Sequence, residues 1–220
     1  MKYIKMSIFL MTLIVTTGCS KQVVKVEEDV YNKSQQILPD DTYKMFDIND
    51  DISLVYGESK TIYIKVDNEY IEVCKTLCSY PKIAPNESAM AFVTGEPDYP
   101  GELYLYNLKN NEKTMLLGND EGSNTPKDVE WLDNKRLLVI KGYGHGTVRL
   151  GGEICIYDID KKEVTPLLMP DELSEYRSII KKDDSFEIEQ ATWEDDTFNK
   201  TNSKIIIYKI SEIEKLADKE

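Results

Sequence analysis

The sequence is poor in several residue types on which common functional sites depend. It has three arginines, Arg136, Arg149 and Arg177, and a single histidine, His145. Bidentate binding of phosphate or carboxylate depends on arginine, so the sequence has few residues that could form such an anion site. A zinc site built on a histidine pair is excluded, and no nucleophile elbow or phosphate-cradling glycine loop is present. The sequence therefore predicts no catalytic set, no cofactor and no metal.

The chain begins with an apolar run that is too short to span a membrane. Met6–Val15 has about ten residues, whereas a membrane-spanning helix needs roughly 20. Small residues and a cysteine follow, and the segment resembles a bacterial lipoprotein signal with Gly18 and Cys19 flanking the cut. The resemblance implies that Cys19 carries a lipid and tethers the protein to the extracytoplasmic face of the cell membrane. Thr16 stands where such signals usually have leucine, so a plain secretory signal and an uncleaved anchor are the alternatives.

The chain is strongly acidic. Removal of residues 1–18 takes away Lys2 and Lys5 but no acid, which leaves 25 basic against 40 acidic residues and a net charge of −15. A surface with this charge is repelled by phosphate backbones, so nucleic acid is not expected as a partner. High solubility alone also accounts for the charge.

Three cysteines remain beyond Cys19. Cys74 and Cys78 are four residues apart and could form a disulfide in an exported protein, although their spacing does not require one. A metal site there lacks a second pair of ligands. Cys155 alternates with isoleucines on a predicted strand, which favours a small buried side chain.

A repeat of 51 residues organises most of the chain. Gly101–Leu117 and Gly152–Leu168 agree at seven of 17 positions, and Ser203–Ile210 follows in the same register. A fixed period of this size indicates one supersecondary unit used repeatedly. We therefore divide the chain into a signal (1–18), a tether with a weak helical pattern (19–42) and one repeat domain (43–220).

The domain is predicted to be all-β, because short segments of alternating polarity are separated by turn residues. Ser211 and Glu214 match a capping box, which predicts a short terminal helix over Glu212–Asp218. Strands are predicted at 53–56, 61–66, 70–74, 89–94, 102–108, 112–117, 128–132, 136–140, 153–159, 164–168, 186–193 and 204–210.

Two segments carry a family resemblance. Ile83–Val93 and Glu102–Leu108 resemble the TolB-type β-propeller repeat, with Asn86 and Glu87 where the repeat usually has Asp-Gly. The whole chain also resembles small uncharacterised lipoproteins of Gram-positive bacteria. This resemblance implies a partial or minimal propeller-like arrangement of three or four units, and it implies no activity.

The repeat also places several loops on one face. The loop Lys141–Gly152 is the most unusual of them, since it holds five glycines, which we interpret as a source of backbone freedom and exposed amides. A flexible surface loop is the plainer interpretation. The candidate ligand face comprises Asp98, Tyr99, Asp120, Glu121, Tyr143, His145 and Arg149.

We therefore expect a non-catalytic, lipid-anchored binding module for an unknown protein, peptide or envelope ligand. An envelope sensor or accessory subunit completed by a partner is the alternative. A hydrolase-related enzyme ranks lower, because the remaining residues leave no room for a hydrolase domain.

Overall fold

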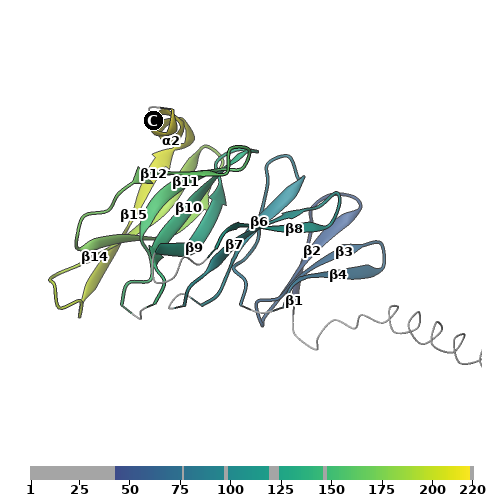
Figure 1. Ribbon diagram of the computed structural model, residues 1–220, viewed down its shortest axis with the longest axis horizontal. Helices are drawn as coiled ribbons and strands as arrows, with labels where there is room; N and C mark the ends of the chain where they lie inside the picture. The colour runs from purple at the N-terminus through teal and green to yellow at the C-terminus, as the bar shows by residue number, and fades with distance from the viewer. Residues whose placement is uncertain (1–42, 76, 97–98, 119–123, 146–147, 219–220) are drawn as a thin grey trace, which may run out of the picture. The chain divides into compact units, whose positions relative to one another are not determined.

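The computed structural model describes residues 43–75, 77–96, 99–118, 124–145 and 148–218. The predicted signal, the tether with its helical pattern and Cys19 lie outside these residues. The described chain is almost entirely β-structure, arranged as four antiparallel sheets that follow one another along the sequence (Figure 1). The predicted all-β, propeller-like class is confirmed.

The strands run in chain order across each sheet, so each sheet is a simple meander. The first sheet contains β1 (Tyr43–Asp47), β2 (Ile52–Gly57), β3 (Ile62–Val66) and β4 (Glu69–Cys74). The second contains β5 (Lys82–Ile83), β6 (Ala89–Thr94), β7 (Glu102–Asn107) and β8 (Glu112–Leu117). The third contains β9 (Asn124–Trp131), β10 (Arg136–Tyr143), β11 (Glu153–Asp158) and β12 (Glu163–Leu168). The fourth contains β13 (Ser174–Lys181), β14 (Ser185–Trp193) and β15 (Thr201–Lys209), and the helix α2 (Ile210–Ala217) follows it.

All twelve predicted strands fall on observed ones, and three observed strands were not predicted. β1 and β5 are short, and the sequence predicted no strand over the residues of β13. β13 begins at Ser174 and pairs with β14 from that residue onward.

The helix α2 is observed, but its predicted cap is wrong. The backbone N–H of Lys209 donates to the Glu212 carboxylate at 2.9 Å, and the helix begins at Ile210, two residues earlier than Ser211 and Glu214 would place it. Glu212 lies in the first turn, where a carboxylate also interacts favourably with the helix dipole.

Side chains alternate along the central strands and fill the spaces on both sides of a sheet. On β10, Leu137 and Val139 pack with the second sheet, whereas Leu138 and Ile140 pack with the fourth. On β6, Phe92 packs with the first sheet. A strand buried on both faces becomes continuously apolar, which explains the apolar run Leu137–Ile140 within β10.

Three core clusters result, and each joins two sheets that are consecutive in the sequence. Within the described ranges, no core cluster joins the first sheet to the fourth. The four sheets therefore form a partial propeller-like arrangement and not a ring closed by hydrophobic packing.

Polar side chains also link neighbouring sheets near their first strands. The Asp128 carboxylate on β9 accepts from the backbone N–H of Ile179 on β13 at 3.0 Å. In the other direction, the Trp131 indole donates to the carbonyl of Lys82 on β5 at 2.7 Å. These bonds satisfy backbone groups of β5 and β13 that would otherwise lack a strand partner.

Candidate functional site

Two of the connections that the repeat places on one face lie beside one another in the third sheet. In an antiparallel meander, the connection between the second and third strands lies at the same end of the sheet as the connection that leaves the fourth. In the third sheet these are the β10–β11 and β12–β13 connections. Together they surround a hollow of about 250 Å³.

The hollow has walls of mixed charge and a partly apolar rim. Lys141 and Arg149 supply positive charge, and the exposed Met169 and Tyr143 supply apolar surface. The residues that line it are Asn124, Lys141, Gly142, Tyr143, Arg149, Gly151, Gly152, Glu153, Met169, Pro170, Asp171, Glu172, Ser174 and Glu175. This surface offers many hydrogen-bonding groups beside a small apolar area.

Arg149 holds the β10–β11 loop against the fourth sheet. Its guanidinium carbon lies 5.2 Å from the ring centre of Trp193 and 5.1 Å from that of Phe198, so two aromatic rings contact it. The two rings meet edge to face. One guanidinium N–H also donates to the carbonyl of Glu172. Arg149 therefore joins three connecting segments, and cation–π contacts of this kind are favourable even near the surface.

Beneath Arg149 lies a buried carboxylate. Glu175 is 2% exposed, and its Oε1 accepts from Arg177 Nε at 2.7 Å and from the Leu150 N–H at 3.3 Å. Its Oε2 is the single buried side-chain polar atom of the described residues without a hydrogen-bond partner. The Arg177 guanidinium also lies 5.7 Å from the Trp193 ring. Two of the three arginines thus meet at one end of the fourth sheet.

The glycines of the loop have a different role from the one predicted. A Cβ on Gly142 would lie 1.7 Å from the Gly151 carbonyl oxygen, and one on Gly152 would lie 1.8 Å from the Lys141 carbonyl oxygen. Gly152 also exchanges two backbone hydrogen bonds of 2.9 Å with Tyr176. Gly142 and Gly152 permit close packing between β10 and the residues that precede β11, and the bonds of Gly152 join this segment to β13. At these two positions the glycines serve close packing and not backbone freedom.

The predicted ligand-face residues do not all meet at the hollow. Tyr143 and Arg149 line it, and the His145 ring contacts Tyr143 edge-on at 6.3 Å between centres. Tyr99 lies on the β6–β7 connection, exposed and away from this hollow. Three further residues, Asp98, Asp120 and Glu121, lie outside the described residues.

Sequence reasoning missed the residues that support the hollow. Trp193 and Phe198 come from the β14–β15 region, and Glu175 comes from the unpredicted strand β13. A usable signal was present, since Trp193 is one of only two tryptophans and ends a predicted strand beside the loop face.

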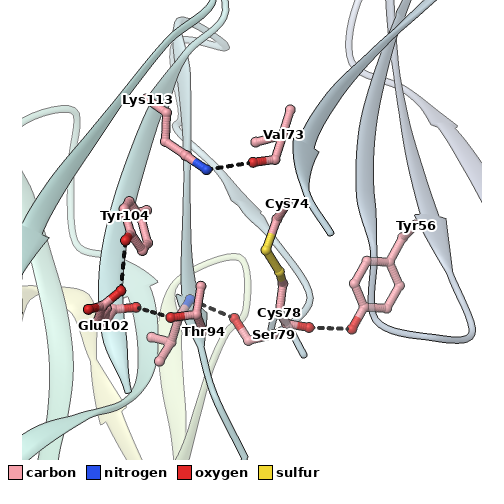
Figure 2. The surroundings of a disulfide bond; sticks show 10 residues. Tyr56, Val73, Cys74, Cys78, Ser79, Thr94, Glu102, Tyr104 and Lys113 are labelled. Atoms are coloured by element: carbon pink, nitrogen blue, oxygen red, sulfur yellow. Dashed lines mark hydrogen bonds between the residues drawn. A yellow bond between two sulfur atoms is a disulfide. The ribbon is translucent and has the colours of Figure 1, made fainter. Parts of the chain in front are cut away.

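The predicted cysteine pair lies at the crossing from the first sheet to the second (Figure 2). Cys74 and Cys78 form a disulfide with their Cα atoms 6.7 Å apart. The Cys78 carbonyl accepts from the Tyr56 hydroxyl at 2.8 Å, and Lys113 Nζ donates to the carbonyl of Val73 at 2.9 Å. The crossing segment is thus held by both sheets.

Over the ranges that the structure describes, no group of three histidine, cysteine, aspartate or glutamate side chains is arranged to hold a metal ion. Over the same ranges, no helix has the length and hydropathy needed to cross a membrane.

Residues 57–209 match the family described as Domain of unknown function (DUF4652). The chain belongs to this family. None of the curated proteins matches it. The family description assigns no activity, and the hollow lies within the matched residues.

Several solved structures are similar to this chain. A protein described as a conserved lipoprotein from Clostridium novyi NT has a TM-score of 0.56 and 22% identity, over 77% of this chain and 95% of its own. A protein described as a TolB from Agrobacterium tumefaciens has a TM-score of 0.48 and 13% identity, over 74% and 64% of the two chains. The β-propeller domain of the Trilobed protease from Pyrococcus furiosus has a TM-score of 0.43 and 15% identity, over 79% and 59%. At 22% identity the likeness to the Clostridium protein establishes the fold alone.

Proposed function

We propose that the protein is a lipid-anchored, extracytoplasmic binding module that takes a protein, peptide or other envelope ligand at the hollow beside Arg149. The observation that carries this proposal is the support of the hollow from behind. Arg149 is fixed between Trp193 and Phe198, and the loop backbone is paired with Tyr176. A supported hollow needs little reorganisation on binding, which favours recognition.

The side chains that remain free around the hollow favour a polypeptide ligand. Tyr143 is 53% exposed and Met169 is 65% exposed, and both line the hollow. Aromatic and methionine side chains are enriched in protein interfaces, and the nearby carboxylates can accept from a peptide backbone. The Lys141 ammonium group can donate hydrogen bonds to the carbonyl groups of such a peptide.

The anchor and the location rest on the N-terminal signal and on the likeness to a protein described as a lipoprotein. Incorporation of labelled palmitate in cells tests the anchor. Wild-type protein should take up label, and Cys19→Ala should not. Equal labelling of the two proteins would contradict the lipid anchor and leave the binding proposal to be tested separately.

Affinity capture of the full-length protein from detergent-solubilised native envelopes tests the ligand site. Tyr143→Ala and Met169→Ala should lose a co-purifying partner that the wild-type protein retains. The matched control is Met115→Ala, because Met115 is 52% exposed on β8 and lies outside the hollow. If all three variants retain the same partners, the hollow is not the binding surface.

The non-catalytic part of the proposal rests on the surroundings of His145. Its ring contacts Tyr143, and no described carboxylate hydrogen-bonds to it as an orienting partner in a catalytic set would. A broad substrate screen tests this part. A turnover that disappears in Tyr143→Ala, His145→Ala and Arg149→Ala would contradict it and favour a hydrolase-related enzyme.

A further inference from the structure

The outer edge of the fourth sheet differs from the outer edges of the other three. Those sheets have four strands each, whereas the fourth has three, so β15 forms its edge within the described chain. β15 has nine residues and pairs with β14 without a register shift. An edge strand presents free backbone N–H and C=O groups to any second strand that reaches it.

The other outer strands carry features that discourage such pairing. β4, β8 and β12 have six residues each, and each has a register shift against its neighbour. β12 also contains Pro166, which has no N–H to donate. Short length, bulges and proline are three of the devices that protect sheet edges, and β15 has none of these three, although it carries Lys204 and Lys209.

β15 also exposes large apolar side chains. Ile205 is 58% exposed and Ile207 is 65% exposed, and both point to the same side of the sheet because they are two residues apart. The helix α2 leaves this edge open, since its Ile213 is buried in the third core cluster and Asp218 lies 3.4 Å from Arg136 of β10. A long edge without a bulge or proline, bordered by two exposed isoleucines, needs an explanation.

We propose that β15 pairs antiparallel with β15 of a second copy of this chain, about a twofold axis at Ile206. In such a pair the sequence numbers of two residues that face each other always have the same sum. Residues that face each other also have their side chains on the same side of the sheet. An axis at Ile206 places Ile205 of each copy opposite Ile207 of the other. The two exposed isoleucines of one copy are then covered by those of the second.

The charges along the strand fit this register. Lys204 faces Tyr208 of the second copy, and Lys209 faces Ser203, so no two like charges are opposed. An axis at Ile207 instead places Ile205 opposite Lys209. An axis at Ile205 leaves Ile207 opposite Ser203. Only the axis at Ile206 pairs both exposed isoleucines with apolar partners, and a strand of the second copy then takes the fourth place in the sheet.

The register is tested by cross-linking full-length chains in cells. Ile205→Cys and Ile207→Cys are expressed alone and together, and oxidation is followed by mass spectrometry of the linked peptides. Coexpression should yield several-fold more dimer linked between positions 205 and 207 than either variant yields alone. The wild-type chain controls for links through its own cysteines. Equal yields in all cultures, or links between identical positions only, would overturn the proposal.

A second measurement does not depend on introduced cysteines. The mass of the wild-type protein in detergent should rise from one to two copies as its concentration increases, and Ile207→Lys should shift this transition to several-fold higher concentration. Met115→Lys places the same charge at an exposed apolar position of a different outer strand, β8, and should behave as the wild type does. A wild-type protein that stays monomeric throughout, or an Ile207→Lys variant that dimerises equally well, would also overturn the proposal.

Discussion

Gly151 lies so close to Tyr176 that a Cβ on the glycine would sit 1.9 Å from the tyrosine carbonyl oxygen. Gly151→Ala must therefore push apart two backbones that join the third and fourth sheets. We expect a loss of about 3 kcal/mol in unfolding free energy, at the upper end of the usual cost of overpacking. Urea denaturation of both proteins measures it.

The control for this substitution is Gly118→Ala. The nearest atoms to a Cβ there belong to the Met115 side chain at 3.6 Å, which is ordinary contact. Its effect should stay within about 0.5 kcal/mol. If both substitutions have the same small effect, the close packing at Gly151 does not stabilise the fold.

Glu87 occupies a turn position that favours glycine. Its φ is 56°, in the left-handed region where a side chain costs about 1–2 kcal/mol. Glycine loses more chain entropy on folding, by roughly 0.5–1 kcal/mol, so Glu87→Gly should stabilise the protein by up to about 1.5 kcal/mol. Thermal unfolding measures the change. Glu163→Gly, in an extended strand, should instead destabilise, and the same sign for both would contradict the explanation.

The disulfide should contribute measurable stability. Cys74 and Cys78 are four residues apart, and closure of so small a loop is worth about 2 kcal/mol in the chain-entropy model. A reductant should lower the melting temperature of the wild-type protein but not that of the double variant Cys74→Ser, Cys78→Ser. A reductant without effect on the wild type would contradict this expectation.

Cys155 provides the control for that experiment. Burial, together with the charge and hydrogen bond of Glu153, raises the pKa of its thiol to about 12. The thiol therefore stays protonated and unreactive at neutral pH. Cys155→Ala should respond to the reductant as the wild type does.

Asp128 should give a pH dependence of stability with a definite sign. Burial raises its pKa above the ordinary value of 3.8, although the N–H groups of Ile179 and Val129 act in the opposite direction. The folded protein therefore binds this proton more tightly than the unfolded chain. The stability from this group is fully present below pH 3.8 and is lost as pH rises through the folded pKa.

Comparison with Asp128→Asn isolates this contribution, because the other acids titrate in both proteins. The unfolding free energy of the wild type minus that of the variant should fall as pH rises from 3.8 through the folded pKa of Asp128. A difference that is flat or rises with pH would show that the pKa of Asp128 is not raised in the folded state.

Most strands could be predicted from the sequence because their side chains alternate and the repeat places them in register. β13 could not be predicted, because polar side chains in this strand are buried and the polar and apolar residues do not alternate. Glu175 is buried there only through its ion pair with Arg177, and a register shift near Tyr176 interrupts the alternation. A charged side chain that is buried by its partner reads in the sequence as solvent-exposed.

The candidate site was predictable in its location but not in its construction. The phase of the repeat placed Tyr143 and Arg149 on the loop face, where both line the hollow. The aromatic partners of Arg149 come from positions more than 40 residues away, and no spacing in the sequence links them. In the sequence, a glycine required for close packing looks the same as a glycine that gives backbone freedom. Gly142 and Gly151 were therefore interpreted as sources of freedom although they serve close packing.

The packing of each sheet on its sequence neighbours has a consequence for how the protein is made. During synthesis a sheet needs only the next segment of about 51 residues to bury its open face. No described core cluster contains residues of both the first and the fourth sheet. Stability then accumulates in steps, as in other linear arrays. Duplication of one segment could lengthen the array without breaking any existing core, so the number of sheets is free to change during evolution.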